Sequence, residues 1–214
     1  MENKVELLEH FGNDLMVVNV ARVSYGKESK ELNEKDSKLL NYLVKHKHTS
    51  PFRHPSLQFR ITCPIYVERQ LHKHQVGISV NSISGRYVDF SDSYTQIETW
   101  RKQSKSSKQG SEGIIHEQQS ARMIEEEVIR TCKGAYNQLL DLGVSKEQAR
   151  TVLPLSLNTT FMWTGSLLAL FHLFNLRLKP DTQAETKEIA DAMLQQVKSI
   201  PGNPFEGCLK AFNL

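Results

Sequence analysis

The segment from Gln70 to Tyr87, with the sequence QLHKHQVGISVNSISGRY, is the part of the chain around which we expect the rest to be organised. It is too poor in apolar residues for a core element, and it combines histidines, cations, serines and glycines. Residues 64–71 lead into it as a predicted helix, and residues 87–90 follow with the alternation of a short strand. A helix that ends in a hydroxyl- and glycine-rich loop between cations offers N–H and O–H donors that suit an anion.

The same segment also allows a plain structural interpretation. Ser, Asn and Gly form ordinary turns, and Lys73 and Arg86 are then solvated surface charges. Two features favour an anion site. Gln70, Lys73 and His74 have the i, i+3, i+4 spacing of one helix face. From Ser79 onward, the polar residues recur in the regular pattern S-x-N-x-x-S-x-R-Y.

This pattern resembles the signature of the flavin-dependent thymidylate synthases. That family has Arg-His-Arg, then Ser, Asn-Glu and Ser-x-Arg-Tyr. The second half of the signature is matched by Ser79, Asn81, Ser84, Arg86 and Tyr87. In the first half, Lys73-His74-Gln75 stands where the family has Arg-His-Arg, with one extra residue before the serine. Ser82 replaces the usual Glu.

Further matches, in the same order as in the family, extend the resemblance over nearly the whole chain. They are ARVS ending at Ser24, HTSPFRH beginning at His48, ARTVLPL with Arg150, and NLR ending at Arg177. Three further positions depart from the family. Ser166 replaces a usual Asn, Leu168 stands where the family often has Arg, and His172 stands where it often has Asn.

The resemblance implies an enzyme that makes thymidylate (dTMP) from deoxyuridylate (dUMP) by reductive methylation. Methylenetetrahydrofolate supplies the carbon, FAD carries the hydride and NADPH is the reductant. It also implies a homotetramer with active sites shared between subunits, with no membrane or nucleic-acid partner. The implied location is the cytoplasm of a bacterium, or of its host if the protein is phage-encoded.

The resemblance also assigns residues. The dUMP-binding set is Gln70, Lys73, Ser82, Ser84, Gly85, Arg86, Arg150 and Arg177. The FAD-binding set is Ser24, His48, Ser50, Lys73, His74, Gln75, Ser166 and His172. Arg177 has the catalytic role, because a guanidinium against the uracil oxygens and nitrogen stabilises the anionic ring without having to titrate. Arg86, Arg150 and the backbone at Ser84-Gly85 suit the phosphate dianion.

Length and composition narrow the classes of protein. The 214 residues are enough for one domain with a sizeable core, which we expect to span residues 1–214. A net charge of +3 does not suggest general nucleic-acid binding. Three widely spaced cysteines without a CxxC pair indicate reduced thiols. We expect no signal peptide, and the most apolar run, residues 167–176, is too short to span a bilayer.

The histidine-rich segment at residues 45–55 has three interpretations. Its His46, His48 and His54 fit no common zinc spacing, and we expect no metal site. A solvated basic loop is the plain alternative. The resemblance favours a segment that borders flavin and folate, with His48 and Ser50 in contact and His54 more structural.

The periodicities predict an α+β fold, with an antiparallel sheet flanked by long helices. The expected strands are residues 57–63, 86–90 and 157–163. Helices are expected after an Asn13 N-cap, at 34–46, from Pro64 as first helical residue, at 114–142, after a Ser145 capping box, from a Ser166 cap to 178, and at 182–200 before a short tail. His172 is a site residue by resemblance, or else an interface or core residue.

The composition of residues 91–113, rich in Ser, Lys, Gln and Gly, predicts a long loop, to which we assign no chemistry. Its basic residues, with those at 45–54, are compatible with a rival function: a nucleotide- or nucleic-acid-binding protein with degenerate chemistry. No cysteine lies in an electropositive motif, which argues against a synthase that uses a cysteine nucleophile.

Overall fold

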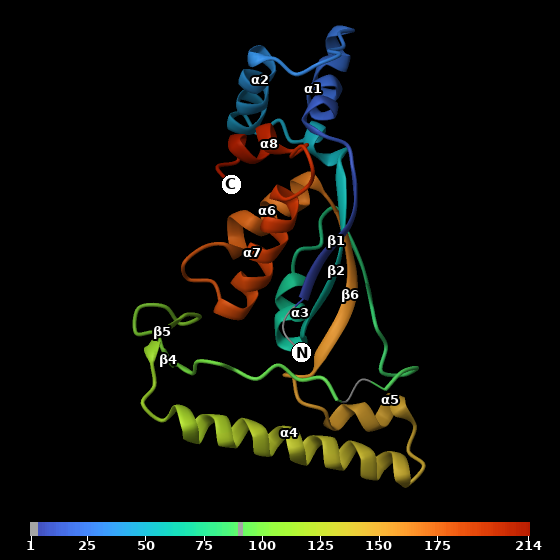
Figure 1. Cartoon of the computed structure of the whole chain (residues 1–214), viewed down its shortest axis with the longest axis vertical. Coiled ribbons are helices and arrows are strands. Elements are labelled where there is room, and N and C mark those ends of the chain that lie inside the picture. Colours follow the sequence, from blue (N-terminus) through green and yellow to red (C-terminus); the bar gives the residue numbers. More distant parts are fainter. Residues whose placement is uncertain (1–3, 90–91) are drawn as a thin grey trace.

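The computed structural model describes residues 4–89 and 92–214. Its centre is a four-stranded sheet with the strand order β1-β2-β6-β3, antiparallel throughout. These strands are β1 (Lys4–Phe11), β2 (Ser56–Pro64), β3 (Ile78–Ser82) and β6 (Asn158–Ser166). Helices pack on one side of the sheet and at both of its ends (Figure 1), so the predicted α+β class is confirmed.

The central pair β2 and β6 confirms two of the predicted strands. The register runs without interruption from Ser56 opposite Ser166 to Pro64 opposite Asn158. Alternate side chains enter the core, as a strand with one buried face requires. The buried ones are Leu57, Phe59, Ile61 and Cys63 on β2 and Phe161 and Trp163 on β6.

The third predicted strand, residues 86–90, is wrong. Residues 85–87 form a turn, and Phe90 lies outside the described residues. The sheet instead gains β3, from within the segment that we expected to be a loop, and β1 at the opposite edge. An edge strand needs only one apolar face, and Ile78 and Val80 provide it while Ser79 and Asn81 remain exposed.

The helices follow the predicted order, with shifted ends. They are α1 (Asp14–Arg22), α2 (Glu34–Lys45), α3 (Ile65–Leu71), α4 (Gln118–Asp141), α5 (Lys146–Ala149), α6 (Leu167–Arg177), α7 (Ala184–Lys198) and α8 (Glu206–Ala211). Short 3-10 turns are η1 (Val23–Tyr25), η2 (Ser50–Arg53) and η3 (Arg150–Val152). The expected short tail is wrong for residues 206–211, since α8 buries Cys208 and Leu209 in the core.

The predicted caps have mixed outcomes. Asn13 Oδ1 accepts from the Met16 N–H at 2.9 Å, and Ser166 Oγ accepts from the Ala169 N–H at 3.2 Å, so both N-caps are confirmed. Pro64 is the last residue of β2 and the N-cap of α3, one position before the expected one. Ser145 is at the N-cap of α5 but makes no side-chain cap bond, so the capping box is wrong.

The segment at residues 91–113 is more ordered than a plain loop. It contains the hairpin strands β4 (Arg101–Gln103) and β5 (Ser111–Ile114), the second of which occupies the expected start of the long helix. Tyr94 forms a bridge with Leu157. The Trp100 main chain exchanges hydrogen bonds of 2.8 and 2.7 Å with the Gln118 amide. The hairpin is therefore attached to the start of α4.

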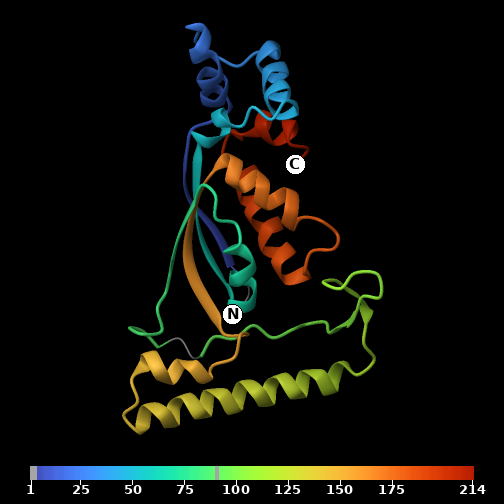
Figure 2. The ribbon, with the colours of Figure 1, turned by 180° about the vertical axis from the view of Figure 1, so that it is seen from behind.

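The helices divide into three groups along the long axis. Helices α3, α6 and α7 cover one face of the sheet, and α1, α2 and α8 gather at one end (Figure 1). Helix α4 crosses the other end, with α5 beside it, as the view from behind also shows (Figure 2). Along α4 only Tyr136 is buried, whereas Met123 and Ile124 are 60% and 66% exposed. In the described ranges, no helix has the length and apolar character that crossing a membrane requires.

A buried carboxylate closes the two ends of the chain on each other. Asp14, at the start of α1, is 3% exposed and accepts hydrogen bonds from the backbone N–H groups of Gly207 and Cys208, at 2.5 and 2.9 Å. The Asp14 N–H in turn donates to the Pro204 carbonyl at 2.8 Å. These bonds satisfy donors at the start of α8 that no helical carbonyl reaches.

We predict that Asp14→Ala lowers the free energy of unfolding by about 1–3 kcal/mol, because two buried N–H groups lose their acceptor. Urea denaturation followed by circular dichroism measures the change. Asp181→Ala is the matched control, since Asp181 is exposed and the expected change is within about 0.5 kcal/mol. Equal losses in the free energy of unfolding for the two substitutions would contradict the stabilising role of the Asp14 hydrogen bonds.

Candidate active site

Arg177, the last residue of α6, is held by two hydrogen bonds from different parts of the chain. Its Nε–H donates to His74 Nε2 at 3.0 Å, and its Nη2–H donates to the Gln70 carbonyl at 2.9 Å. We call Arg177, Gln70 and His74 the Arg177 cluster. A guanidinium has five N–H donors, and these bonds use two of them. The plane of the guanidinium, which we call the fork, is therefore fixed by the bonds of its Nε and Nη2 atoms. We call the side with these two bonds its inner edge.

The spacing that predicted Gln70, Lys73 and His74 on one helix face is only partly right. Helix α3 ends at Leu71, so Lys73 and His74 follow it. The His74 N–H still bonds to the Leu71 carbonyl at 3.0 Å, which continues the turn and brings His74 to the side of Gln70. Lys73 and Gln75 are exposed. Only Gln70 and His74 of this segment meet Arg177 in the bonds described above.

His74 is a neutral acceptor in this arrangement. Burial, and after it the charges of Arg177 and His172, together lower the pKa of its imidazole to about 4. Since Nε2 accepts the Arg177 bond, the single proton of the ring is on Nδ1. Burial also lowers the pKa of Arg177, but a guanidinium remains a cation at any physiological pH.

A cavity of about 490 Å³ lies next to the N-terminus of α6. We call it the Ser166 cavity. Its polar lining includes Thr49, Arg53, Ser79, Ser166 and His172, and its apolar lining includes Val76, Leu168 and Ala169. Gly77 closes one side with its carbonyl 3.0 Å from the Ser166 N–H and a φ of +74°, where an added Cβ would lie 3.0 Å from Ser166 Oγ.

Two of the residues assigned to FAD line this cavity, and two more are neighbours of a lining residue in the chain. Ser166 and His172 line it, and His48 and Ser50 flank the lining residue Thr49 in the chain. His172 is exposed, so the alternative that it is a core residue is wrong. Its charge also contributes to the lowered pKa of His74, which indicates that the cavity adjoins the Arg177 cluster.

The other assigned residues lie elsewhere in a single chain. Ser24 is in η1, directly after α1, and its hydroxyl donates to the Ala21 carbonyl at 3.4 Å. Arg150 is in η3, directly after α5, and its Nε–H donates to the Glu147 carbonyl at 3.3 Å. Helices α1 and α5 are at opposite ends of the long axis (Figure 1). One copy of the chain therefore does not bring Ser24 and Arg150 to one cavity.

The turn after β3 holds the remaining nucleotide candidates. Ser84 Oγ accepts from both the N–H and the Nε–H of Arg86 at 3.3 Å, and the Arg86 guanidinium lies 5.1 Å from the centre of the Tyr87 ring. Gly85 is buried between them in the chain. The hydroxyl of Ser82 donates to Glu68 Oε1 at 2.8 Å. The carboxylate of Glu68 is thus in direct contact with Ser82, the serine that replaces the usual Glu.

Sequence reasoning missed several lining residues. Thr49 and Arg53 belong to the histidine-rich segment at residues 45–55, which the sequence analysis singled out. The position of Arg53 next to His54 could have indicated a cationic ligand. Ser79 was matched to the family pattern but given no role. Among residues 4–89 and 92–214, no three His, Cys, Asp or Glu side chains are grouped as a metal site would require.

The two fully buried thiols, Cys63 and Cys208, are poor nucleophiles. Burial raises the pKa of Cys63 to about 12 and raises that of Cys208 further above the ordinary range. Cys132 is half-buried on α4, and no cysteine in the described ranges is in a disulfide. Cys63 and Cys208 stay protonated at neutral pH, so nucleophilic attack by a buried thiolate does not fit this structure.

Comparisons with known proteins agree on one family. Residues 6–201 match the family model described as "Thymidylate synthase complementing protein". A flavin-dependent thymidylate synthase from Thermus thermophilus is 42% identical over 194 residues, which cover 91% of this chain and 71% of the relative. The corresponding enzyme from Kosmotoga olearia is 39% identical over 198 residues, covering 91% of this chain and 85% of its own.

The fold has a close match among solved structures. The UMP/dUMP methylase PolB from Streptomyces cacaoi, bound with 5-Br dUMP, superposes with a TM-score of 0.88 at 28% identity. The match covers 99% of this chain and 95% of PolB. A second PolB structure, bound with 5-Br UMP, gives a TM-score of 0.85 at 26% identity.

We predict that the His74 imidazole in the native protein titrates with a midpoint of about 4, below the ordinary 6.5. The neutral form is favoured in the folded state. The stability that His74 contributes is therefore complete above pH 6.5 and is lost as the pH falls through about 4. NMR titration of the ring, assigned by its loss in His74→Gln, measures the midpoint.

Arg177→Met serves as the control for the cause of this shift. Removing the guanidinium is expected to raise the midpoint only in part, because burial is the larger cause. A native midpoint near 6.5 would show that His74 is solvated and does not accept the Arg177 bond.

Proposed function

The chain belongs to the flavin-dependent thymidylate synthase family, and from this premise we propose that the Arg177 cluster and the Ser166 cavity are two parts of its active site. The protein is a methyltransferase that converts dUMP to dTMP, with FAD as its cofactor. NADPH as the reductant and methylenetetrahydrofolate as the carbon donor belong to the proposal. So does the cytoplasm, of a bacterium or of a phage host, which suits three unpaired cysteines.

The observation that carries the proposal is the oriented guanidinium of Arg177. Uracil becomes a carbon nucleophile at C5 when electron density is pushed into its ring. A fixed cationic fork against the ring oxygen and nitrogen favours the anionic form, and it costs no reorganisation at the moment of reaction. His74 and the Gln70 carbonyl hold the fork from behind, at 3.0 and 2.9 Å, and so leave its outer edge for the nucleotide.

The Ser166 cavity has the donors that FAD requires. The hydroxyls of Ser79 and Ser166 and the cation of Arg53 suit diphosphate oxygens, while Leu168 and Ala169 provide an apolar wall for a flat ring. When bound, FAD supplies the hydride chemistry that protein side chains lack. Lys73 and Gln75, in the place of two arginines, are exposed, and we propose that they meet the cofactor from the rim.

The nucleotide phosphate is assigned to cations outside the Arg177 cluster. Arg86 already bonds to Ser84 in the turn before Tyr87, which orders a guanidinium and a hydroxyl side by side. With the Gly85 backbone they can offer several donors to one dianion. Arg150 is proposed as a further phosphate ligand, and Ser82 as a ligand of the nucleoside.

We further propose a homotetramer whose active sites are completed by residues from neighbouring subunits. The support is twofold. Ser24 and Arg150 are on elements at opposite ends of one chain, and α4 exposes an apolar stripe that includes Met123, Ile124 and Val128. Light scattering measures the mass in solution. A monomer that retains FAD would refute the tetramer.

The experiment that tests the function combines a spectrum with an assay. The purified protein is expected to show a flavin absorption band and to form dTMP from dUMP with methylenetetrahydrofolate and NADPH. A colourless protein that takes up no added FAD would favour the rival function, a nucleotide- or nucleic-acid-binding protein with degenerate chemistry.

We predict that Arg177→Lys folds and binds FAD like the wild type but forms dTMP at least about a hundredfold more slowly, the scale of losing one preorganised donor. Lysine keeps the positive charge but loses the planar fork. Product formation and dUMP-dependent flavin oxidation are measured in parallel. If Arg177 serves only the dipole at the end of α6, charge alone suffices and turnover would stay near that of the wild type.

A further inference from the structure

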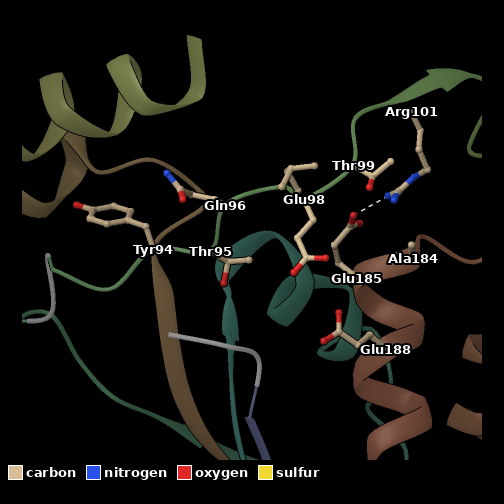
Figure 3. Close-up of a pocket in the computed structure, with 10 residues that line it drawn as sticks. Tyr94, Thr95, Gln96, Glu98, Thr99, Arg101, Ala184, Glu185 and Glu188 are labelled. Atoms are coloured by element: carbon tan, nitrogen blue, oxygen red, sulfur yellow. Dashed lines mark hydrogen bonds and ion pairs between the residues drawn. The ribbon is translucent and has the colours of Figure 1, made fainter. Parts of the chain in front are cut away.

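A continuous series of hydrogen-bonded side chains leads from the Arg177 cluster to the β4–β5 hairpin. Gln70 Nε2 donates to Gln183 Oε1 at 2.5 Å. Gln183 Nε2 donates to Glu185 Oε2 at 2.9 Å. The other carboxylate oxygen of Glu185 accepts from Arg101 Nη2 at 2.6 Å, as the dashed line in Figure 3 marks. We call Gln70, Gln183, Glu185 and Arg101 the Gln183 relay.

Each amide in the relay has a fixed orientation. Gln183 faces a donor on one side and a carboxylate on the other, so its oxygen must point to Gln70 and its nitrogen to Glu185. Gln70 is then held twice, because its main-chain carbonyl accepts from Arg177 while its side chain donates to Gln183. The end of α3 is in this way fixed between α6 and the start of α7.

The charge at the centre of the relay is well compensated. The Glu185 side chain is 13% exposed and that of Arg101 is 27% exposed. Burial alone would raise the pKa of Glu185, but hydrogen bonds from Arg101 and Gln183 outweigh it and hold the pKa below its ordinary value. Glu185 is therefore ionised at neutral pH. Removing one partner of such a pair leaves the other partly buried and unpaired.

The far end of the relay belongs to the hairpin. Arg101 is the first residue of β4, and its Nε–H also donates to Ser111 Oγ of β5 at 3.0 Å. Arg101 and Glu185 line a cavity of about 440 Å³ between residues 94–101 and the start of α7 (Figure 3). The ion pair connects the hairpin to α7 across this cavity. The hairpin is thereby connected, through Arg101, Glu185 and Gln183, to the side chain of Gln70.

We propose that Gln183 and Glu185 are positioning residues for the reaction: they orient Gln70, and through it Arg177, toward the nucleotide, and they link this orientation to the seating of the hairpin. The inference rests on the proposed role of Gln70 and Arg177 in binding dUMP. Neither Gln183 nor Glu185 touches the substrate. Their loss affects steps that need an ordered nucleotide and leaves the reduction of FAD by NADPH unchanged.

The test compares Glu185→Gln with Asp191→Asn in the FAD-loaded enzyme. Asp191 is also on α7, and its carboxylate bonds to Lys187 at 2.6 Å, outside the relay. For Glu185→Gln we expect kcat/KM for dUMP to fall about tenfold or more, mainly through KM. We expect the flavin band and the rate of NADPH oxidation without dUMP to stay within about twofold of wild type. Asp191→Asn is expected to match wild type in all of these measurements.

Gln183→Ala and a double-mutant cycle complete the test. Gln183→Ala breaks the relay but keeps both partners of the Arg101–Glu185 ion pair, so it decides the matter if Glu185→Gln does not fold. Arg101→Met combined with Glu185→Gln is expected to be no worse than Glu185→Gln alone, because both act through one path. Values of kcat/KM within about twofold of wild type for Gln183→Ala, or additive losses in the cycle, would overturn the relay. Failure of the wild type to make dTMP would instead overturn the proposed function.

Discussion

The antiparallel pairing of β2 with β6 is the constraint from which the candidate site follows. Each of these strands runs directly into a helix: β2 ends at Pro64, the N-cap of α3, and β6 ends at Ser166, the N-cap of α6. Because Pro64 is opposite Asn158 and Ser166 is opposite Ser56, the two helices begin at opposite ends of the sheet. They then run toward each other on the same face, and their C-terminal ends meet.

The meeting of two helix C-termini explains why an arginine is stable there. The last carbonyls of a helix lack helical partners and carry partial negative charge. Arg177 ends α6, and its guanidinium bonds to the Gln70 carbonyl at the end of α3, so one cation serves both ends. The same bonds that stabilise the fold also fix the plane of the guanidinium, which in the proposed function activates uracil.

The departures from the family pattern become clearer in three dimensions. Ser82 lacks the carboxylate of the usual Glu, but Glu68 stands 2.8 Å from its hydroxyl and restores an acidic group at that place. His172 lies on the exposed side of α6 and lines the Ser166 cavity. Lys73 and Gln75 are exposed and polar, although a lysine is a point charge and lacks the fork of an arginine. At Ser82, at least, the acidic group comes from a neighbouring element.

The sequence by itself determined the local features and the family. Alternation from Leu57 to Cys63 and around Phe161 predicted the two central strands, Asn13 and Ser166 were readable as caps, and the ordered motifs indicated the family. These signals lie within a few residues of one another, where periodic burial and capping act. The same local view failed for β1 and β3, since an edge strand has only one face to bury, and for α8, whose donors find their acceptor in Asp14 at the other end of the chain.

Only the tertiary structure decided which site residues act together. Arg177 and His74 are 103 positions apart, and Gln70 and Gln183 are 113 apart, yet each pair is directly bonded. The lowered pKa values of His74 and Glu185 depend on the burial and the partners that this folding creates. Contacts of this kind depend on how the paired strands direct the chain, and no short window of sequence contains that path.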